Sequence, residues 1–380
     1  MRLMVDTTIY FWQRIVTPHM AYLADAIALK GFETVYVANQ SMSEARAQMG
    51  WSSPKLERAK LLMAPDSESV LKVVREAPAN SIHVCQGLRS NGLVAHAQSA
   101  LANLGRRQWA VIETVDDEGA IGVLKRLVYR WIIWRKRSQL EAILAIGRET
   151  TDWLIARGAN RDKVFPFAYF LPDSIGCINR QRCVGRPFRF VFVGQLIERK
   201  RVDFLLRALA RMGEFDFELE IVGDGPLRGE WEAIAADLLP GKVSWLGRIP
   251  MTKIPQMMAN ADCLVLPSRH DGWGAVVSEA LMVGTPVVCS DACGAAEVVM
   301  SSGYGGVFPK DDVVELTSLL KCVLDAGPLG EAERSSLKEW TSSLGGGAGA
   351  NYFLETLRSL EQDGKRPRVP WISLDYRDPS

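Results

Sequence analysis

The sequence predicts an α/β protein made of two doubly wound parallel-sheet domains in tandem. Two observations support this prediction: short β-branched runs alternate with helical stretches along most of the 380-residue chain, and the alternation pauses once, at a polar segment near the middle. Strands that alternate with helices favour a parallel sheet, because each helix carries the chain back across a sheet face. We therefore expect two domains with separate cores.

The first domain is expected over residues 1–170. Its predicted strands are the runs RLMVD, TVYVAN, SIHVC, QWAVIE, AILAIG and VFPFAY, and its predicted helices lie at 16–30, 67–77, 91–104, 121–138 and 148–157. The segment 171–187 has prolines near both ends and no hydrophobic period, so it is expected to be a linker.

The second domain is expected over residues 188–345, with strands at the runs FRFVFVG, ELEIVG, VSWLG, DCLVLPS, PVVCS and GGVF. The glycine-rich run SSLGGGAGAN at 342–351 is predicted to be a flexible hinge. A helix is predicted at 350–362; it could pack on either domain, and we place it on the first. The segment 363–380 is predicted to be an extended tail.

The composition limits the partners and the location of the protein. The formal net charge is +1, which gives no overall attraction to nucleic acid. The seven cysteines form no C-x-x-C pair and several lie in apolar runs, as is typical of reduced, buried thiols. No apolar run reaches the roughly 18 residues that a membrane-spanning helix needs. We expect a cytoplasmic protein that is neither secreted nor integral to a membrane.

A glycine turn after the first strand of the second domain is a candidate phosphate site. The run FVGQLIERK places Gly194 at the end of a buried strand and brings Arg199 and Lys200 to the start of a helix. Glycine lets a backbone approach a phosphate closely, and two cations beside a helix N-terminus can neutralise a diphosphate. A solvated basic helix start is an equally good interpretation. The next strand ends in a second tight turn, which contains Gly223 and Asp224.

Two acidic residues flank a third glycine turn, in the run HDGWGAVVSE. Its two glycines, Gly272 and Gly274, permit a sharp turn from strand to helix, which leaves free amides at the helix start, those of Gly274, Ala275 and Val276. Asp271 precedes the turn and Glu279 lies inside the helix, so both carboxylates can line one pocket and contact different parts of a ligand. Alternatively, Asp271 caps the helix and Glu279 lies on its surface.

Five motifs agree in order and spacing with a known family. The runs FVGQLIERK, IVGDGP, VSWLG, ADCLVLPS and HDGWGAVVSEALMVGTPVV resemble, over about residues 188–300, the C-terminal domain of the family 4 retaining glycosyltransferases. The resemblance implies the GT-B fold, in which two Rossmann-like domains face each other across a cleft, and a nucleotide-sugar donor as substrate without a cofactor. No Asp-x-Asp occurs in the chain, which indicates a metal-independent enzyme whose leaving diphosphate is stabilised by cations and helix dipoles.

The resemblance also implies roles for individual residues. Asp271 takes the place of the first glutamate in the family's Glu-x7-Glu element and would contact the donor sugar, while Glu279 would contact the ribose. Lys200 matches the family lysine, and Gln195 stands where many members have an arginine, so Arg199 is expected to compensate. The donor-binding set is expected to comprise Gly194, Gln195, Arg199, Lys200, Gly223, Asp224, Arg248, Gly272, Trp273, Gly274, Ala275, Val276 and Glu279.

The first domain resembles the family less. Members often carry a histidine after the fourth strand, where this chain reads WAVIETVDDEG, and Glu113 is our candidate for that position beside the catalytic Asp271, Glu279, Arg199 and Lys200. Alternatively, Glu113 caps a helix or forms a salt bridge, and Asp116 or Asp117 takes its role. His19, early in the first helix, is a candidate for binding an acceptor phosphate, although a lone histidine is more often structural.

One stretch carries a strong local charge. The run LKRLVYRWIIWRKRSQL at 124–140 contains six basic residues and no acid. On a helical projection its leucines, valine and tryptophans gather opposite most of the charges. Such a helix suits an anionic membrane surface, and the residues expected to contact it are Lys125, Arg126, Arg130, Trp131, Trp134, Lys136 and Arg137. Alternatively, the apolar stripe packs on the sheet and the basic face is solvated.

Together these features predict a retaining glycosyltransferase that moves a sugar from a nucleotide donor to a lipid-linked or polysaccharide precursor. Its expected place is the inner face of a bacterial membrane, in the synthesis of an exopolysaccharide, a lipopolysaccharide or another envelope glycan. Two alternatives stay open. A sugar-nucleotide epimerase would turn over the donor without an acceptor, and a non-catalytic membrane-associated scaffold derived from a transferase would not bind the donor.

Overall fold

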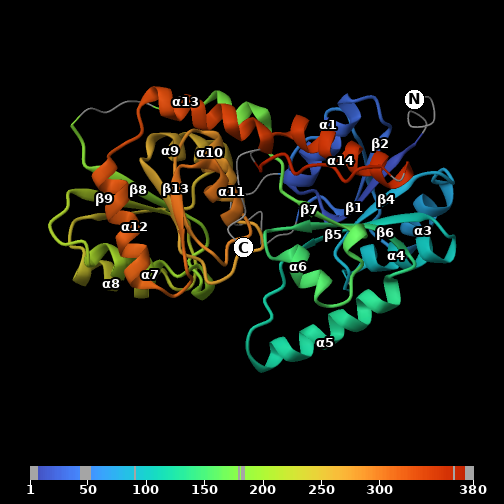
Figure 1. Ribbon diagram of the computed structural model, residues 1–380, viewed down its shortest axis with the longest axis horizontal. Coiled ribbons are helices and arrows are strands. Elements are labelled where there is room, and N and C mark those ends of the chain that lie inside the picture. The colour runs from blue at the N-terminus through green and yellow to red at the C-terminus, as the bar shows by residue number, and fades with distance from the viewer. Residues whose placement is uncertain are drawn as a thin grey trace. The chain divides into compact units, whose positions relative to one another are not determined.

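The computed structural model describes residues 7–42, 53–89, 91–178, 180, 185–362 and 364–372 (Figure 1). This part of the chain divides into two compact units. Unit 1 contains the described residues up to Pro172 together with Gly345–Pro370, and unit 2 contains Asp173–Leu344 together with Trp371. Each unit is built around one parallel sheet, so the predicted α/β fold of two doubly wound domains is confirmed. The cleft expected between the domains stays a prediction.

Seven parallel strands form the sheet of unit 1, in the order β3-β2-β1-β4-β5-β6-β7. The strands are β1 (Ile9–Ile15), β2 (Thr34–Gln40), β3 (Lys60–Met63), β4 (Ile82–Gln86), β5 (Arg107–Glu113), β6 (Leu140–Ile146) and β7 (Val164–Phe167). The helices are α1 (Pro18–Leu29), α3 (Ser67–Glu76), α4 (Leu93–Asn103), α5 (Gly119–Lys136), α6 (Thr150–Ile155) and α14 (Gly346–Glu361). The central strands are almost continuously apolar and buried, because helices cover both of their faces.

The sequence analysis did not predict two strands of unit 1, β1 and β3. The predicted strand RLMVD lies outside the described residues, whereas β1 is formed by the run IYFWQRI that follows it. This run is rich in aromatic and β-branched side chains and lies between β2 and β4, where it is buried. The second strand, β3, is short and lies at the sheet edge, where a weak pattern is usual.

Helix α14 packs against α1 and therefore belongs to unit 1. In the sequence, 172 residues lie between Pro172 and Gly345, the two points at which the chain leaves and re-enters this unit. The prediction of a flexible hinge at 342–351 is wrong, since the helix begins at Gly346 within that run. At Gly349 a Cβ would lie only 2.3 Å from Cγ of Phe170. The glycines therefore let a helix lie very close to its neighbours, and burial outweighs their weak helix propensity.

Six parallel strands form the sheet of unit 2, in the order β10-β9-β8-β11-β12-β13. The strands are β8 (Phe188–Val193), β9 (Phe217–Val222), β10 (Val243–Gly247), β11 (Cys263–Leu266), β12 (Val287–Ser290) and β13 (Gly305–Phe308). The helices are α7 (Val202–Ala210), α8 (Arg228–Leu238), α9 (Ile254–Asn260), α10 (Ala275–Met282), α11 (Ala296–Ser302), α12 (Val313–Ala326) and α13 (Glu331–Trp340). All six strands coincide with predicted runs.

The strand order decides where a ligand can bind. In unit 2 the chain leaves β8 toward one edge of the sheet and returns at β11 on the other side, so β8 and β11 are neighbours at a topological switch point. Ligands of open α/β sheets bind beyond the carboxyl ends of the strands at such a point. The carboxyl ends of β8 and β11 are therefore the place to search for a site. Within the described chain, no helix is long and apolar enough to cross a bilayer.

Candidate functional site

The cations that follow β8 meet the acid that follows β11. Lys200 ends a short 3-10 helix, Glu198–Lys200. Its side chain is mostly buried, and its Nζ donates a hydrogen bond to Oδ2 of Asp271. The Ser268 hydroxyl also donates to this oxygen, at 3.4 Å. Arg199 donates from Nη1 to the His270 carbonyl oxygen at 3.0 Å, and the same nitrogen lies 3.8 Å from Oδ1 of Asp271. The structure thus brings together three of the predicted catalytic residues.

Backbone hydrogen bonds hold the Asp271 loop in place. The Asp271 amide donates to the carbonyl oxygen of Ala292 at 3.1 Å, and the Gly294 amide donates to the Asp271 carbonyl oxygen at 3.0 Å. Asp271 and Cys293 form an isolated parallel bridge through this pair. The carboxylate is therefore presented from a fixed backbone, although Asp271 lies outside any strand.

The start of α10 has the geometry of an anion site. Its N-cap residue Gly274 adopts φ 82°, and no side chain caps the helix. A Cβ at Gly274 would lie 2.6 Å from Sγ of Cys293, so both the conformation and the packing require glycine. Among the described residues, the amides of Ala275 and Val276 donate to no backbone oxygen. Unpaired amides and the positive end of the helix dipole favour an anionic group here.

Glu279 lies in the second turn of the same helix and is partly buried. Burial raises the pKa of its carboxyl group from 4.5 to about 7. No hydrogen bond to this carboxylate occurs within the described part of the chain, so its oxygens remain available to hydroxyl groups of a ligand. A half-ionised acid that lacks a protein partner is typical of a binding or catalytic residue.

The second predicted turn adjoins the first. The Leu196 amide donates to the Asp224 carbonyl oxygen at 3.0 Å, which ties the loop after β8 to the loop after β9. Oδ2 of Asp224 lies 3.2 Å from Nε of Arg248, just beyond β10. Gly194, Gln195 and Gly223 lie in these same loops, at the carboxyl edge of the sheet. The predicted donor-binding residues thus gather along one edge of unit 2.

Trp273 has a buried side chain. Its indole nitrogen donates to the Ser278 hydroxyl at 3.1 Å, so the ring belongs to the core beneath the α10 loop. The ring of Trp371 packs against it edge to face, with centroids 6.3 Å apart. Trp371 is buried in unit 2, so at this point the predicted extended tail contacts the site loop. Sequence reasoning missed this residue, and only its size and apolar character hinted at burial.

Comparison with known proteins identifies the domain that carries this site. The family model described as "Glycosyl transferases group 1" matches residues 179–339, a range that contains every predicted donor-binding residue. These residues, called the group 1 domain here, are similar to that family. The 2-deoxystreptamine glucosyltransferase of Streptomyces kanamyceticus is 32% identical to the chain over 152 residues, which are 39% of this chain and 39% of that protein. The chain therefore matches less than half the length of this relative.

Solved structures extend the likeness to both units. The lipopolysaccharide outer core galactosyltransferase WaaB in its apo form superposes with a TM-score of 0.71 at 16% identity and covers 93% of this chain and 99% of its own. Anabaena Alr3699/HepE in complex with UDP superposes with a TM-score of 0.70 at 17% identity, covering 93% and 100%. At such low identity the likeness concerns the fold alone. The group 1 domain and unit 1 together therefore have the fold of solved glycosyltransferases, the GT-B fold.

Two further predicted residues lie outside the group 1 domain, in unit 1, and a third residue joins them. Glu113 ends β5 and accepts a hydrogen bond from the Tyr169 hydroxyl. The His19 ring, near the start of α1, stacks on the Tyr169 ring with centroids 4.5 Å apart. Glu113 and His19 thus share one neighbour at the carboxyl edge of this sheet. Sequence reasoning missed Tyr169, because it lies in a loop after β7 with no motif around it.

Asp116 and Asp117, the alternatives to Glu113, have different surroundings. Asp117 accepts hydrogen bonds from the Trp153 indole at 2.9 Å and from Arg157, and these partners lower the pKa of its carboxyl group despite burial, which opposes them. These bonds tie the segment before α5 to α6 and to the turn that follows it. Asp116 lies before α5, and its carbonyl oxygen accepts a hydrogen bond from Lys125.

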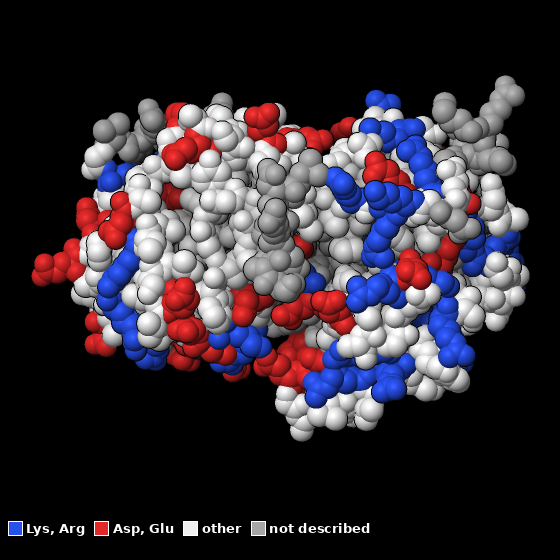
Figure 2. Space-filling view, in the orientation of Figure 1, with Lys and Arg blue, Asp and Glu red and all other residues white. Residues whose placement is uncertain are grey.

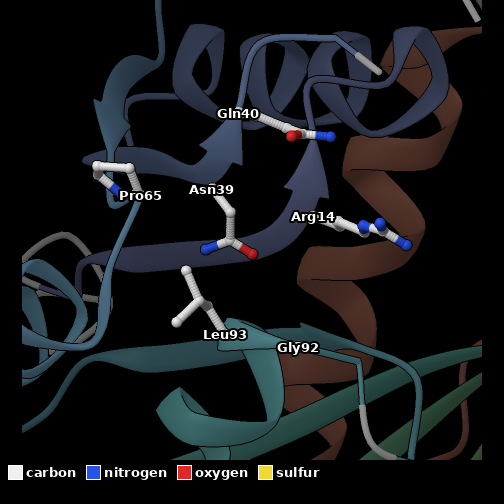
Figure 3. A pocket seen from close by; sticks show the side chains of 6 residues that line it. All are labelled: Arg14, Asn39, Gln40, Pro65, Gly92 and Leu93. Carbon is white, nitrogen blue, oxygen red and sulfur yellow. The ribbon is translucent and has the colours of Figure 1, made fainter. Parts of the chain in front are cut away.

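A cavity in unit 1 was not predicted. It has a volume of about 450 Å³ and lies at the carboxyl ends of β1 and β2 and the start of α4 (Figure 3). The side chain of Asn39 extends from the end of β2 and that of Arg14 from the end of β1. The remaining lining residues are Gln40, Pro65 and Gly92. Because β1 and β4 flank the switch point of this sheet, the cavity occupies the position at which open α/β sheets bind ligands.

Proposed function

We propose that the protein is a retaining glycosyltransferase that takes a sugar from a nucleotide-sugar donor and transfers it to a lipid-linked or polysaccharide precursor. One observation carries the proposal. At the switch point of the group 1 domain, Lys200 and Asp271 pair beside the unpaired amides of α10, and Glu279 follows in the same helix. Cations and free amides match the negative charges of a sugar nucleotide's diphosphate, and the acids match the hydroxyl groups of its sugars.

The donor diphosphate would bind between the cations and the helix start. As the bond between the sugar and the diphosphate breaks, negative charge grows on the leaving oxygen, and Arg199, Lys200 and the amides of Ala275 and Val276 stabilise it. Oriented groups of this kind stabilise the transition state more than the ground state, which is what accelerates transfer. The acceptor hydroxyl then attacks the same face of the sugar and loses its proton to the departing phosphate oxygen.

The two acids would bind the ends of the donor. Glu279 accepts hydrogen bonds from the ribose hydroxyls, and Asp271 serves the donor sugar while it holds Lys200 in position. Hydroxyl groups bind an ionised carboxylate more strongly than a neutral one, and the pKa of Glu279 lies at about 7. Donor binding is therefore expected to favour the ionised form of this residue.

The acceptor would bind unit 1. Both the Glu113–Tyr169–His19 group and the cavity beside Arg14 lie at the carboxyl edge of its sheet. The fold neighbour WaaB, a lipopolysaccharide outer core galactosyltransferase, supports an envelope glycan as the product. We place the reaction at the inner face of a bacterial membrane, where such glycans are assembled.

The direct test is a transfer assay with a panel of nucleotide sugars and envelope saccharide precursors. Lys200→Ala and Glu279→Ala should each reduce transfer by about 100-fold or more, as expected when a charge-stabilising group is lost. Lys321→Ala, on α12, is the matched control and should leave transfer unchanged. Transfer at near-normal rates in the two site variants would contradict the assigned roles.

The same assay separates the alternatives. A transferase turns over the donor much faster once the acceptor is added, whereas a sugar-nucleotide epimerase needs no acceptor. A scaffold would bind no nucleotide sugar in calorimetry. We also propose that the reaction needs no metal ion, so a chelator should leave the rate unchanged; a rate restored only by added divalent cation would contradict this.

A further inference from the structure

The outer face of α5 is an exposed apolar surface. Five large side chains lie on it, with exposed fractions between 54% and 72%: Ile121 (72%), Leu124 (63%), Leu127 (60%), Trp131 (54%) and Trp134 (58%). Their spacing of three or four residues brings them onto one side of the helix. Single exposed apolar residues are ordinary, but a continuous stripe of this kind marks an interaction surface.

A different face attaches α5 to unit 1. Tyr129, Ile132 and Ile133 are buried and pack in the hydrophobic cluster formed with β6 and α6. The alternative that the leucines and tryptophans pack on the sheet is therefore wrong. The helix has two apolar faces, and only the one with Tyr129, Ile132 and Ile133 belongs to the core.

The basic residues divide into two groups. Three are held by protein partners: Lys125 donates to the Asp116 carbonyl oxygen, Arg126 to that of Asp117 at 2.8 Å and Lys136 to the Gln98 side chain at 2.8 Å. The prediction that these three face a membrane is accordingly revised.

The other basic residues border the apolar face. Arg130, Arg135 and Arg137 are exposed. The guanidinium groups of Arg135 and Arg137 lie 5.3 Å from the ring centroids of Trp131 and Trp134 respectively. Figure 2 shows basic side chains beside uncharged ones over α5, at the lower edge of unit 1 in this view. A tryptophan with an arginine over its ring combines an apolar surface and a positive charge at one place on the helix.

Helix α5 contains no acidic residue, and the nearest acids on its N-terminal side precede it. The run 119–137 contains no acid, and the acids Asp116, Asp117 and Glu118 precede the first turn. Positive charge therefore increases toward the C-terminal half of α5, where the two tryptophans lie. This asymmetry favours contact through that half.

We propose that α5 docks on an anionic lipid bilayer, with its axis in the plane of the surface. Trp131, Trp134 and the leucines enter the headgroup region, and Arg130, Arg135 and Arg137 contact lipid phosphates. The positive charge beside the apolar stripe selects this occupant over an uncharged one. The proposal stands apart from the transfer reaction, since it needs neither donor nor acceptor.

Vesicle flotation of the full-length protein tests the proposal. The protein should float with vesicles that contain phosphatidylglycerol and phosphatidylcholine, and not with pure phosphatidylcholine. Added salt should weaken the association, because it screens the arginines. Flotation that is indifferent to lipid charge, or its absence, would overturn the proposal.

Three variants separate the contributions. Trp131→Ala/Trp134→Ala should weaken partition by at least about tenfold, and Arg130→Gln/Arg135→Gln/Arg137→Gln by about fivefold for each charge removed. Leu104→Ser/Val314→Ser is the matched control, since it removes apolar side chains that are 50% exposed just after α4 and 62% exposed on α12, and it should float as the parent does. Thermal unfolding at the parental temperature shows that each variant is folded.

A second copy of the chain is the competing occupant of this face. Analytical ultracentrifugation without lipid distinguishes it from a membrane. A monomer that floats with anionic vesicles supports the proposal. A dimer that the tryptophan variant dissociates would overturn it.

Discussion

At the scale of single residues, Glu279 connects stability with function. Its carboxyl group is partly buried and has no partner within the described chain, and burial raises its pKa to about 7. Below about pH 4.5 the group is protonated in both the folded and the unfolded chain. Between about pH 4.5 and pH 7 the folded protein keeps a proton that the unfolded chain releases, so the free energy of unfolding falls as the pH rises through this window.

Glu279→Gln should therefore stabilise the protein at pH 8, by up to about 3 kcal/mol, since one pKa unit corresponds to about 1.4 kcal/mol. Near about pH 3 the variant and the parent should have the same melting temperature, because both side chains are then neutral in the folded and the unfolded chain. Transfer activity should fall, since the amide replaces an ionised acceptor of hydroxyl groups. Melting curves at the two pH values check the expectation, and equal stability of the two proteins at pH 8 would contradict it.

Donor binding by the parent should show the same titration. If the donor prefers ionised Glu279, its dissociation constant should rise about tenfold for each pH unit below 7. Glu279→Gln provides the control for titration of the diphosphate itself, because any pH dependence that remains in the variant belongs to the ligand. Identical pH dependence in both proteins would exclude ionisation of Glu279 from donor binding.

At the scale of elements, the start of α10 depends on one glycine. Gly274→Ala places a Cβ against Sγ of Cys293, at 2.6 Å, in a backbone conformation that alanine rarely adopts. The loop must then shift, and the amides of Ala275 and Val276 move with it. We expect donor affinity to fall by about tenfold or more, measured by calorimetry, while the fold of unit 2 is retained.

Gly303→Ala is the matched control for this change. Gly303 follows α11 with φ 72°, but a Cβ there has nothing within 4 Å. Its substitution should carry the cost of backbone strain, about 1 kcal/mol of stability, without any effect on the donor. Equal loss of donor affinity in both variants would show that strain, rather than the position of the α10 amides, is responsible.

At the scale of the whole molecule, the last helix stabilises the first unit. Phe353 of α14 is buried, with its ring centroid 4.9 Å from that of Trp109 and 5.9 Å from that of Phe11. Phe353→Ala should destabilise unit 1 by about 3–5 kcal/mol, because it leaves a cavity between aromatic rings. Hydrogen exchange should show lost protection in β1 and β5 and unchanged protection in β8 and β11.

Leu337→Ala supplies the reciprocal control. Leu337 lies in α13, is fully buried and belongs to unit 2. Its removal should lower the protection of β8 and β11 by the same mechanism, while β1 and β5 keep theirs. Loss of protection in unit 2 alone after Phe353→Ala would contradict the assignment of α14 to unit 1.

The sequence alone determined the features that depend on consecutive residues. The alternation of strands and helices follows from local hydrophobic period, and the glycine turns follow from local backbone requirements. For this reason the α/β fold and the grouping of Arg199, Lys200 and Asp271 could be predicted. Each of these residues lies in the segment that connects the carboxyl end of a strand to the next helix, and parallel strands bring those ends to one edge.

Only the tertiary structure decided which surfaces meet. In α5, Tyr129 is buried and Trp131 is exposed, which identifies the face that packs on unit 1. In α14, Gly349 packs closely on Phe170, so a glycine-rich run is helical. Trp371 packs against Trp273, although about a hundred residues separate them in the sequence. No pattern in the residues around either tryptophan predicts this contact. Such contacts depend on the register of distant elements and on side-chain volume, which a hydrophobic period does not encode.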